Sequence, residues 1–180
     1  MFAGKTEELL RRVRRASIAG QRVVVVSHAL DTRAGSDRVA SHAGLDAPSR
    51  PAASAADVLA VVDGETVDMV AIDEAHFFGP DLVDAVTRLA DTGLLVVVAG
   101  LDVTFTGEPF EPMPSLMALA ERVDKLTSIC AICGADAIFH ARVNGTAAGD
   151  PTLVTENVGG LETYQARCRR HFNSGADEAT

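Results

Sequence analysis

The three cysteines of this chain and one histidine form two short pairs near the C-terminal end, Cys130-x-x-Cys133 and Cys168-x-x-His171. A gap of two residues lets one tight turn direct two side chains at the same ion, and two such turns complete a tetrahedral zinc site. Three buried structural cysteines with a surface histidine are the alternative, but two pairs of this spacing rarely arise by accident. Four protein ligands leave no position for a catalytic water, so we expect a structural zinc ion that stabilises a small domain.

The size and charge of the chain limit the kinds of function. With 180 residues, of which 47% are hydrophobic, the chain can bury one substantial core and a small second one. A net charge of -9 argues against binding a nucleic acid polymer, although a single nucleotide in a cleft is not excluded. The apolar segments are too short to span a membrane, and no signal peptide is recognisable. Free thiols also suit a reducing compartment, so we expect a cytoplasmic protein with no membrane partner.

Apolar runs typical of buried strands alternate with amphipathic segments typical of helices. We expect strands over Arg22–Ser27, Val67–Asp73 and Leu94–Gly100. We expect helices over Glu7–Ala19, Ala55–Val62, Pro80–Thr92 and Ser115–Val123. Residues 31–56 are rich in Asp, Ala, Ser, Gly and Pro, which predicts a long surface segment. The alternation predicts an α/β fold with a parallel sheet and helices on both of its faces.

Two short motifs point to phosphate chemistry. Gly4-Lys5-Thr6 directly precedes the first expected helix, as in the second half of a phosphate-binding loop. Alone this tripeptide is weak evidence, because an ordinary helix N-terminus with a solvated lysine has the same pattern. Asp73 and Glu74 add support, since they end an apolar strand, where open α/β sheets bind ligands. Asp73 is suited to hold Mg²⁺ and Glu74 to accept a proton, with solvated acids at the start of a loop as the alternative.

Several sequence blocks add to these motifs. They are MFAGKTEELLRRVRR at the N-terminus, DTR at 31–33, IDEAHFF at 72–78, AGLDVTFTGEPF at 99–110, CAIC at 130–133, and VGG, Tyr164 and CRRH within 158–171. In these blocks and in their order over residues 1–172 the chain resembles the zinc-containing type II thymidine kinases. The resemblance implies a P-loop (RecA-like) parallel sheet and a small C-terminal zinc-ribbon-like domain with a lasso loop. It also implies ATP-dependent phosphorylation of the 5′-hydroxyl of thymidine or deoxyuridine, giving dTMP for nucleotide salvage and DNA precursor synthesis.

The resemblance assigns roles to individual residues. Gly4, Lys5 and Thr6 become phosphate-loop residues, with Thr6 and Asp73 as magnesium ligands. Asp31 and Arg33 match residues near the transferred phosphoryl group, where a cation stabilises developing charge. Glu74 matches the proposed general base. Zinc on Cys130, Cys133, Cys168 and His171 would anchor the lasso loop.

The nucleoside site is also assigned by resemblance. The matching positions are Met1, Phe77, Leu101, Phe105, Phe110, Val158, Gly159, Gly160 and Tyr164. Several of these side chains are apolar, as a slot for a base requires, although apolar residues also fill any ordinary core. His76 stands where the family often has glutamine, and His140 occupies a loop position near the nucleoside. A change of contacts and simple solvation both remain open for these two histidines.

The expected organisation is a nucleotide-binding domain over 1–128, a zinc and lasso domain over 129–172 and a disordered tail over 173–180. The resemblance also suggests a homotetramer with thymidine triphosphate as a feedback inhibitor. In the family, a strand and Gly-Pro precede the methionine, whereas this sequence starts at Met1, so we expect the first strand to be missing. The alternative functions are a truncated protein that binds nucleotides with weak or no catalysis, and a generic nucleotide hydrolase.

Overall fold

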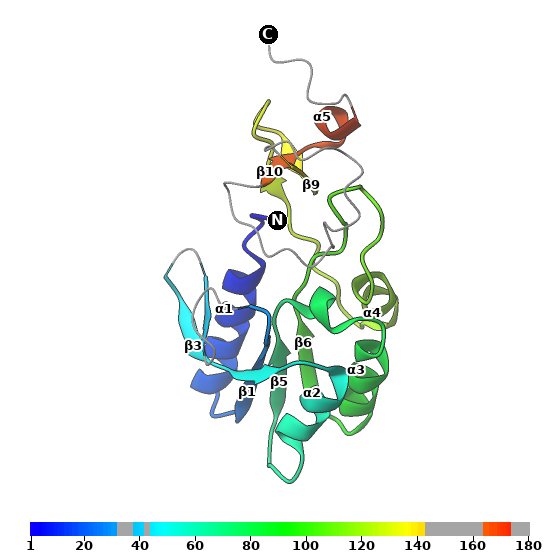
Figure 1. Ribbon diagram of the computed structural model, residues 1–180. Helices are drawn as coiled ribbons and strands as arrows, with labels where there is room; N and C mark the ends of the chain where they lie inside the picture. The colour runs from blue at the N-terminus through cyan, green and yellow to red at the C-terminus, as the bar shows by residue number, and fades with distance from the viewer. Residues whose placement is uncertain (32–37, 42–43, 143–163, 174–180) are drawn as a thin grey trace. The chain divides into compact units, whose positions relative to one another are not determined.

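The computed structural model describes residues 1–31, 38–41, 44–142 and 164–173 (Figure 1). The chain divides into two compact units. The first, which we call the sheet unit, contains Gly4–Asp102 and Glu111–Arg122. The second, the cysteine unit, contains Met1–Ala3, Val103–Phe110 and the chain from Val123 onward. Among the described residues, none of the helices combines the length and the apolar character needed to cross a membrane.

A four-stranded parallel sheet forms the centre of the sheet unit. Its strands are β1 (Val23–His28), β4 (Arg50–Ala52), β5 (Met69–Ile72) and β6 (Leu95–Val98), in the order β4-β1-β5-β6. The valine run of β1 pairs with β5 in register from Val23 opposite Met69 to Val26 opposite Ile72. β5 pairs in turn with β6. Parallel strands place their carboxyl ends along one edge, so the segments that follow β1, β5 and β6 share that edge.

Helices cover both faces of this sheet (Figure 1). The helices of the unit are α1 (Lys5–Ile18), α2 (Ala55–Val62), the short 3-10 helix η1 (Ala75–Phe78), α3 (Leu82–Asp91) and α4 (Met113–Leu119). One face of the sheet, including Val26 and Ile72, packs against α2, α3 and α4. The other face, including Val25 and Ala71, packs against the apolar side of α1. Alternate residues of β1, β5 and β6 therefore enter opposite cores, which confirms the predicted α/β fold.

Residues 31–56 differ from the expected surface segment. Where it is described, this stretch contains an antiparallel hairpin, β2 (Arg38–Ala40) with β3 (Asp46–Pro48), and the sheet strand β4. β4 has only three residues and contains Pro51, which lacks a backbone donor. An edge strand tolerates such a proline because one of its sides needs no partner, so the composition of this stretch concealed a strand. The helix predicted over Ser115–Val123, α4, also starts and ends earlier than expected, at Met113 and Leu119.

The described residues of the cysteine unit form only short elements. They are β7 (Ser128–Ile129), β8 (Asp136–Ala137), β9 (Phe139–Arg142), β10 (Tyr164–Arg167) and α5 (Arg169–Asn173), with β7 paired to β8 and β9 to β10. The rings of Phe139 and Phe172 stack at 4.5 Å. Gly107 approaches Phe172 so closely that a Cβ there would lie 2.8 Å from its ring, at a φ of +88°. So small an apolar core calls for an additional cross-link.

Candidate functional site

The start of α1 meets the carboxyl end of β5. Gly4 caps the helix with a φ of 75°, a left-handed conformation that glycine adopts without strain. Two residues later, in the first turn of α1, the Thr6 hydroxyl donates a hydrogen bond to Asp73 Oδ2 at 2.9 Å. The structure thus brings together the two predicted magnesium ligands, which are 67 residues apart in the chain.

Asp73 is almost completely buried, with 2% of its surface exposed. Burial, and then the neighbouring charge of Glu74, raise the pKa of the Asp73 carboxyl to about 6, although the hydrogen bond from Thr6 opposes this. Its second oxygen, Oδ1, is buried and has no hydrogen-bond partner among the described residues. A buried carboxylate oxygen of this kind is expected where a cation completes the site. The arrangement of Thr6 and Asp73 therefore fits Mg²⁺.

Glu74 has an unusual backbone conformation, with φ 49° and ψ 42°. For a residue with a Cβ, this left-handed conformation is unfavourable by roughly 1–2 kcal/mol. Glu74 is nevertheless held there, at 8% exposure, between β5 and η1. Its Oε2 lies 3.6 Å from Nδ1 of His76. Backbone strain at a buried carboxylate is typical of a site where side-chain direction matters more than stability.

The predicted nucleoside residues lie in both units. Phe77 belongs to the sheet unit, where its ring lies 4.2 Å from that of His76 and 5.5 Å from that of His28. Leu101 follows β6 in the same unit and donates its backbone N–H to His76 Nδ1 at 3.2 Å. The cysteine unit contains the predicted residues Met1, Phe105, Phe110 and Tyr164.

Phe105 and Tyr164 surround a cation that the sequence did not single out. The guanidinium of Arg142 lies 5.3 Å from the centre of the Phe105 ring and 5.8 Å from that of Tyr164. The His140 ring meets Tyr164 edge-on at 5.5 Å, so His140 is buried and not simply solvated. The contacts of Tyr164 with Arg142 and His140 depend on the pairing of β9 with β10, in which Tyr164 lies opposite Arg142. A local sequence pattern does not reveal such a pairing.

The structure describes only some of the remaining predicted site residues. Asp31 donates its backbone N–H to the carbonyl of His28, at the carboxyl end of β1. Arg33 and the lasso residues Val158, Gly159 and Gly160 lie outside the described residues, as do 174–180 of the predicted tail.

The cysteine and histidine pairs converge on one point in the cysteine unit. The ligand atoms of Cys130, Cys133, Cys168 and His171 all lie within 4.8 Å of one another. The Sγ atoms of Cys133 and Cys168 are 3.8 Å apart, and Cys168 Sγ is 3.4 Å from His171 Nδ1. Zinc bond lengths in a tetrahedral site require about 3.8 Å between sulfurs and about 3.6 Å between sulfur and nitrogen. The four residues therefore fit a tetrahedral metal ion.

The thiol environment also favours metal binding. Burial raises the pKa of the Cys130 thiol. Hydrogen bonds from backbone N–H groups, the first of them at Cys168, and from the His171 ring outweigh this effect and lower the pKa to about 5. The thiolate is the form that ligates metals. The three cysteines are free, and the 3.8 Å between Sγ of Cys133 and Sγ of Cys168 is much longer than a disulfide bond of about 2.05 Å. This group can bind a metal such as zinc.

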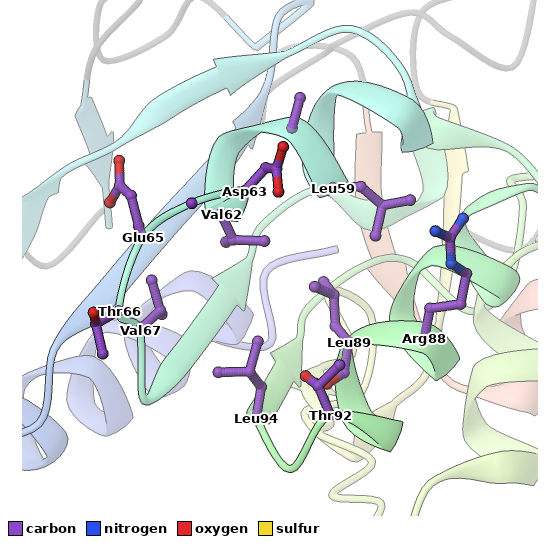
Figure 2. A pocket seen from close by; sticks show the side chains of 12 residues that line it. Leu59, Val62, Asp63, Glu65, Thr66, Val67, Arg88, Leu89, Thr92 and Leu94 are labelled. Carbon is purple, nitrogen blue, oxygen red and sulfur yellow. The ribbon is translucent and has the colours of Figure 1, made fainter.

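A cavity of about 640 Å³ opens at the opposite end of the sheet (Figure 2). Its apolar lining comes from α2 and α3, including Leu59 and Leu89. Val67 and Leu94 complete it from the segments that precede β5 and β6. These segments mark the amino ends of the strands, whereas Asp73 and Glu74 follow the carboxyl end of β5. The cavity is therefore separate from the predicted site.

Comparison with known proteins agrees with the blocks described above. A sequence model of the thymidine kinase family matches residues 1–172. A thymidine kinase of Deinococcus deserti is 47% identical over 183 aligned positions, covering 95% of this chain and 89% of the relative. Thymidine kinases of two Halobacterium salinarum strains are 50% identical, covering 94% of this chain and 88% of the relatives. The chain therefore belongs to the thymidine kinase family.

Proposed function

We propose that this protein is a thymidine kinase, which transfers the γ-phosphoryl group of ATP to the 5′-hydroxyl of thymidine or deoxyuridine. Membership of the family supports the reaction class. The observation that carries the proposal in this chain is the partnerless Oδ1 of buried Asp73, beside the Thr6 hydroxyl and the strained Glu74. A phosphoryl-transfer site needs this combination of metal-binding oxygens and an oriented base.

The phosphate side of the proposed site uses the start of α1. The backbone of Gly4 and the charge of Lys5 bind the phosphates, while Thr6 and Asp73 would hold Mg²⁺. A bound Mg²⁺ would neutralise charge on the phosphate oxygens of ATP. Asp31 and Arg33 are proposed to lie near the transferred group, where the Arg33 guanidinium stabilises charge that develops during transfer.

The proposed chemical step uses Glu74 as the general base. The 5′-oxygen of the nucleoside forms a bond to the γ-phosphorus, and the bond from that phosphorus to the bridging oxygen of ADP breaks. Glu74 accepts the proton that the hydroxyl loses. Phe77, Leu101, Phe105, Phe110 and Tyr164 are proposed to enclose the nucleoside with Met1 and the lasso residues Val158, Gly159 and Gly160.

We propose that the metal at the Cys130 cluster is zinc and that its role is structural. All four ligands come from the protein, so no position remains for a reacting water. The two ligand pairs flank residues 143–163 in sequence, so a bound ion restrains both ends of the predicted lasso. We assign nucleotide binding to 1–128 and the zinc and lasso function to 129–172.

Three further proposals concern assembly, regulation and location. A homotetramer and inhibition by thymidine triphosphate rest on the family resemblance, whereas a cytoplasmic location rests on the free thiols, which suit a reducing compartment. Size-exclusion chromatography with light scattering tests the first. A rise in the thymidine concentration needed for half-maximal rate, on adding thymidine triphosphate, tests the second.

The test of the proposed function is phosphoryl transfer from ATP to a panel of nucleosides with Mg²⁺. We expect thymidine and deoxyuridine to give 5′-monophosphates, and 5′-deoxythymidine, which lacks the accepting hydroxyl, to give no product. ADP formation that does not require a nucleoside would instead identify a hydrolase. Absence of product with both nucleosides would refute the proposal.

A further inference from the structure

The His76 side chain links the ends of two neighbouring strands of the sheet. His76 lies in η1, directly after β5, and is 5% exposed. Its Nδ1 accepts the backbone N–H of Leu101, which follows β6, at 3.2 Å. Because Nδ1 accepts this hydrogen bond, the neutral ring carries its proton on Nε2.

Backbone contacts bring the same two segments close together. The N–H of Ala75 donates to the carbonyl of Ala99 at 2.9 Å, so η1 is tied to the end of β6. A Cβ on Gly100 would lie 3.3 Å from the backbone nitrogen of His76 and 2.7 Å from Met113 Sδ, so only glycine allows this close approach. This backbone hydrogen bond reaches only as far as Ala99, however, so it does not fix the positions of Gly100 and Leu101. The His76 ring supplies that restraint at Leu101.

The same ring nitrogen also borders the proposed base. Nδ1 of His76 lies 3.6 Å from Glu74 Oε2, which is beyond hydrogen-bonding distance but within packing contact. One buried side chain therefore touches both the carboxylate proposed to take the proton and the backbone of a residue proposed to contact the nucleoside. A shift of about 1 Å between two such groups can lower a rate by roughly 10²-fold.

We propose that His76 is a positioning residue, which fixes the Leu101 backbone relative to the Glu74 carboxylate and so presents the nucleoside hydroxyl to the base. The inference rests on the proposed function for its kinetic consequence, but its structural part stands on the hydrogen bond alone. What matters is an acceptor at the place of Nδ1. Asparagine can supply one, because its Oδ1 occupies nearly the same position, whereas leucine cannot.

The kinetic test compares His76→Asn and His76→Leu with the parent protein. We expect His76→Leu to raise the KM for thymidine by about 3- to 10-fold, as expected for loss of one hydrogen bond, and to lower kcat. The KM for ATP should stay within about twofold, because Gly4, Lys5 and Thr6, which are proposed to bind the phosphates, lie at the start of α1 and not on η1. His76→Asn should restore the thymidine KM to within about threefold. Equal impairment by both variants, or an equal rise in both KM values, would overturn the proposal.

Amide hydrogen exchange tests the structural part without any assay of activity. In His76→Leu, the Leu101 amide should exchange faster relative to the Ala99 amide, which bonds to the Ile72 carbonyl. His28 provides a matched control, since it is also 5% exposed and its Nδ1 accepts a backbone N–H, from Leu30, at 3.2 Å. His28→Leu should leave the ratio of Leu101 to Ala99 exchange unchanged. An unchanged ratio in His76→Leu would refute the inference, and a parent protein without kinase activity would refute only the proposed function.

Discussion

The acidic residues at the carboxyl end of β5 and the ligands of the cysteine cluster lie in opposite electrostatic environments. At the sheet edge, burial raises the pKa of Asp73 to about 6, one of its oxygens lacks a partner, and Glu74 has a left-handed backbone. At the cluster, backbone N–H groups and His171 lower the pKa of Cys130 to about 5, and four ligand atoms already converge. The first arrangement is unfavourable until a cation arrives with the substrate, and the second favours an ion that stays bound. Stability and catalysis should therefore respond to substitutions in different regions.

The largest effect is expected at the cluster. Cys133→Ser removes one thiolate, so the protein should lose its metal and the cysteine unit should unfold at a lower temperature. Structural zinc contributes about 10–16 kcal/mol to the folding of small zinc domains, and the small core of this unit cannot replace that contribution. Metal analysis and thermal denaturation of the purified protein measure both effects.

The control at the cluster is Ala131→Ser, which adds a hydroxyl to an exposed position in the same turn. This variant should retain about one zinc ion per chain. Parent protein produced with ample zinc under reducing conditions and found to contain none would contradict the structural assignment.

Glu74→Gln should have the next largest effect. Glutamine keeps the shape of the side chain but cannot accept the proton, so turnover should fall by about 10²- to 10⁴-fold while ATP binding and zinc content persist. Steady-state kinetics and ATP titration measure the two properties. Asp84→Asn, at an exposed carboxylate of α3, serves as the control and should leave turnover unchanged. If Glu74→Gln retained turnover within a few-fold of the parent, Glu74 would not be the base.

A smaller effect, of opposite sign on stability, is expected at Asp73. Asp73→Asn removes a buried charge but keeps an acceptor for the Thr6 hydroxyl. In buffer without Mg²⁺, the free energy of unfolding should rise by about 1–3 kcal/mol, whereas affinity for Mg²⁺-ATP should fall. Urea denaturation and nucleotide titration provide the two readings. A loss of stability would show that the buried charge is satisfied in the free protein.

The smallest effect is expected at Glu8, an ordinary paired carboxylate in the same unit. A hydrogen bond from Arg11, and then others including that from Arg12, lower the pKa of Glu8 to about 2 despite some burial. Glu8→Gln should therefore destabilise the protein at pH 7, by no more than about 1 kcal/mol. A lowered pKa stabilises the folded state above the ordinary value of 4.5, and this contribution disappears as the pH falls toward 2. Urea denaturation at several pH values should show the difference between parent and variant shrinking over this range.

Sequence patterns predicted the parts of the structure that depend on local periodicity. The apolar valine runs predicted β1 and β6, and the apolar run of β5 predicted that Asp73 and Glu74 lie at a strand end. The spacing of the cysteines and the histidine predicted the metal ligands. β4 was missed because a three-residue edge strand containing proline has no periodicity. The left-handed Glu74 and the hydrogen bond between His76 and Leu101 depend on neighbouring strands in the sheet. No local signal in the sequence encodes such contacts.

Replacement of the cluster metal by Co²⁺ tests the division between the two regions most directly. Co²⁺ accepts the same tetrahedral ligands as zinc but differs from it as a Lewis acid. If the cluster only stabilises structure and the sheet edge performs the chemistry, kcat for thymidine-dependent ADP formation should agree within about twofold between the Zn²⁺ and Co²⁺ forms. A change in kcat of about tenfold or more between two equally folded forms would contradict this account, because it would place the metal of the cluster in the reaction.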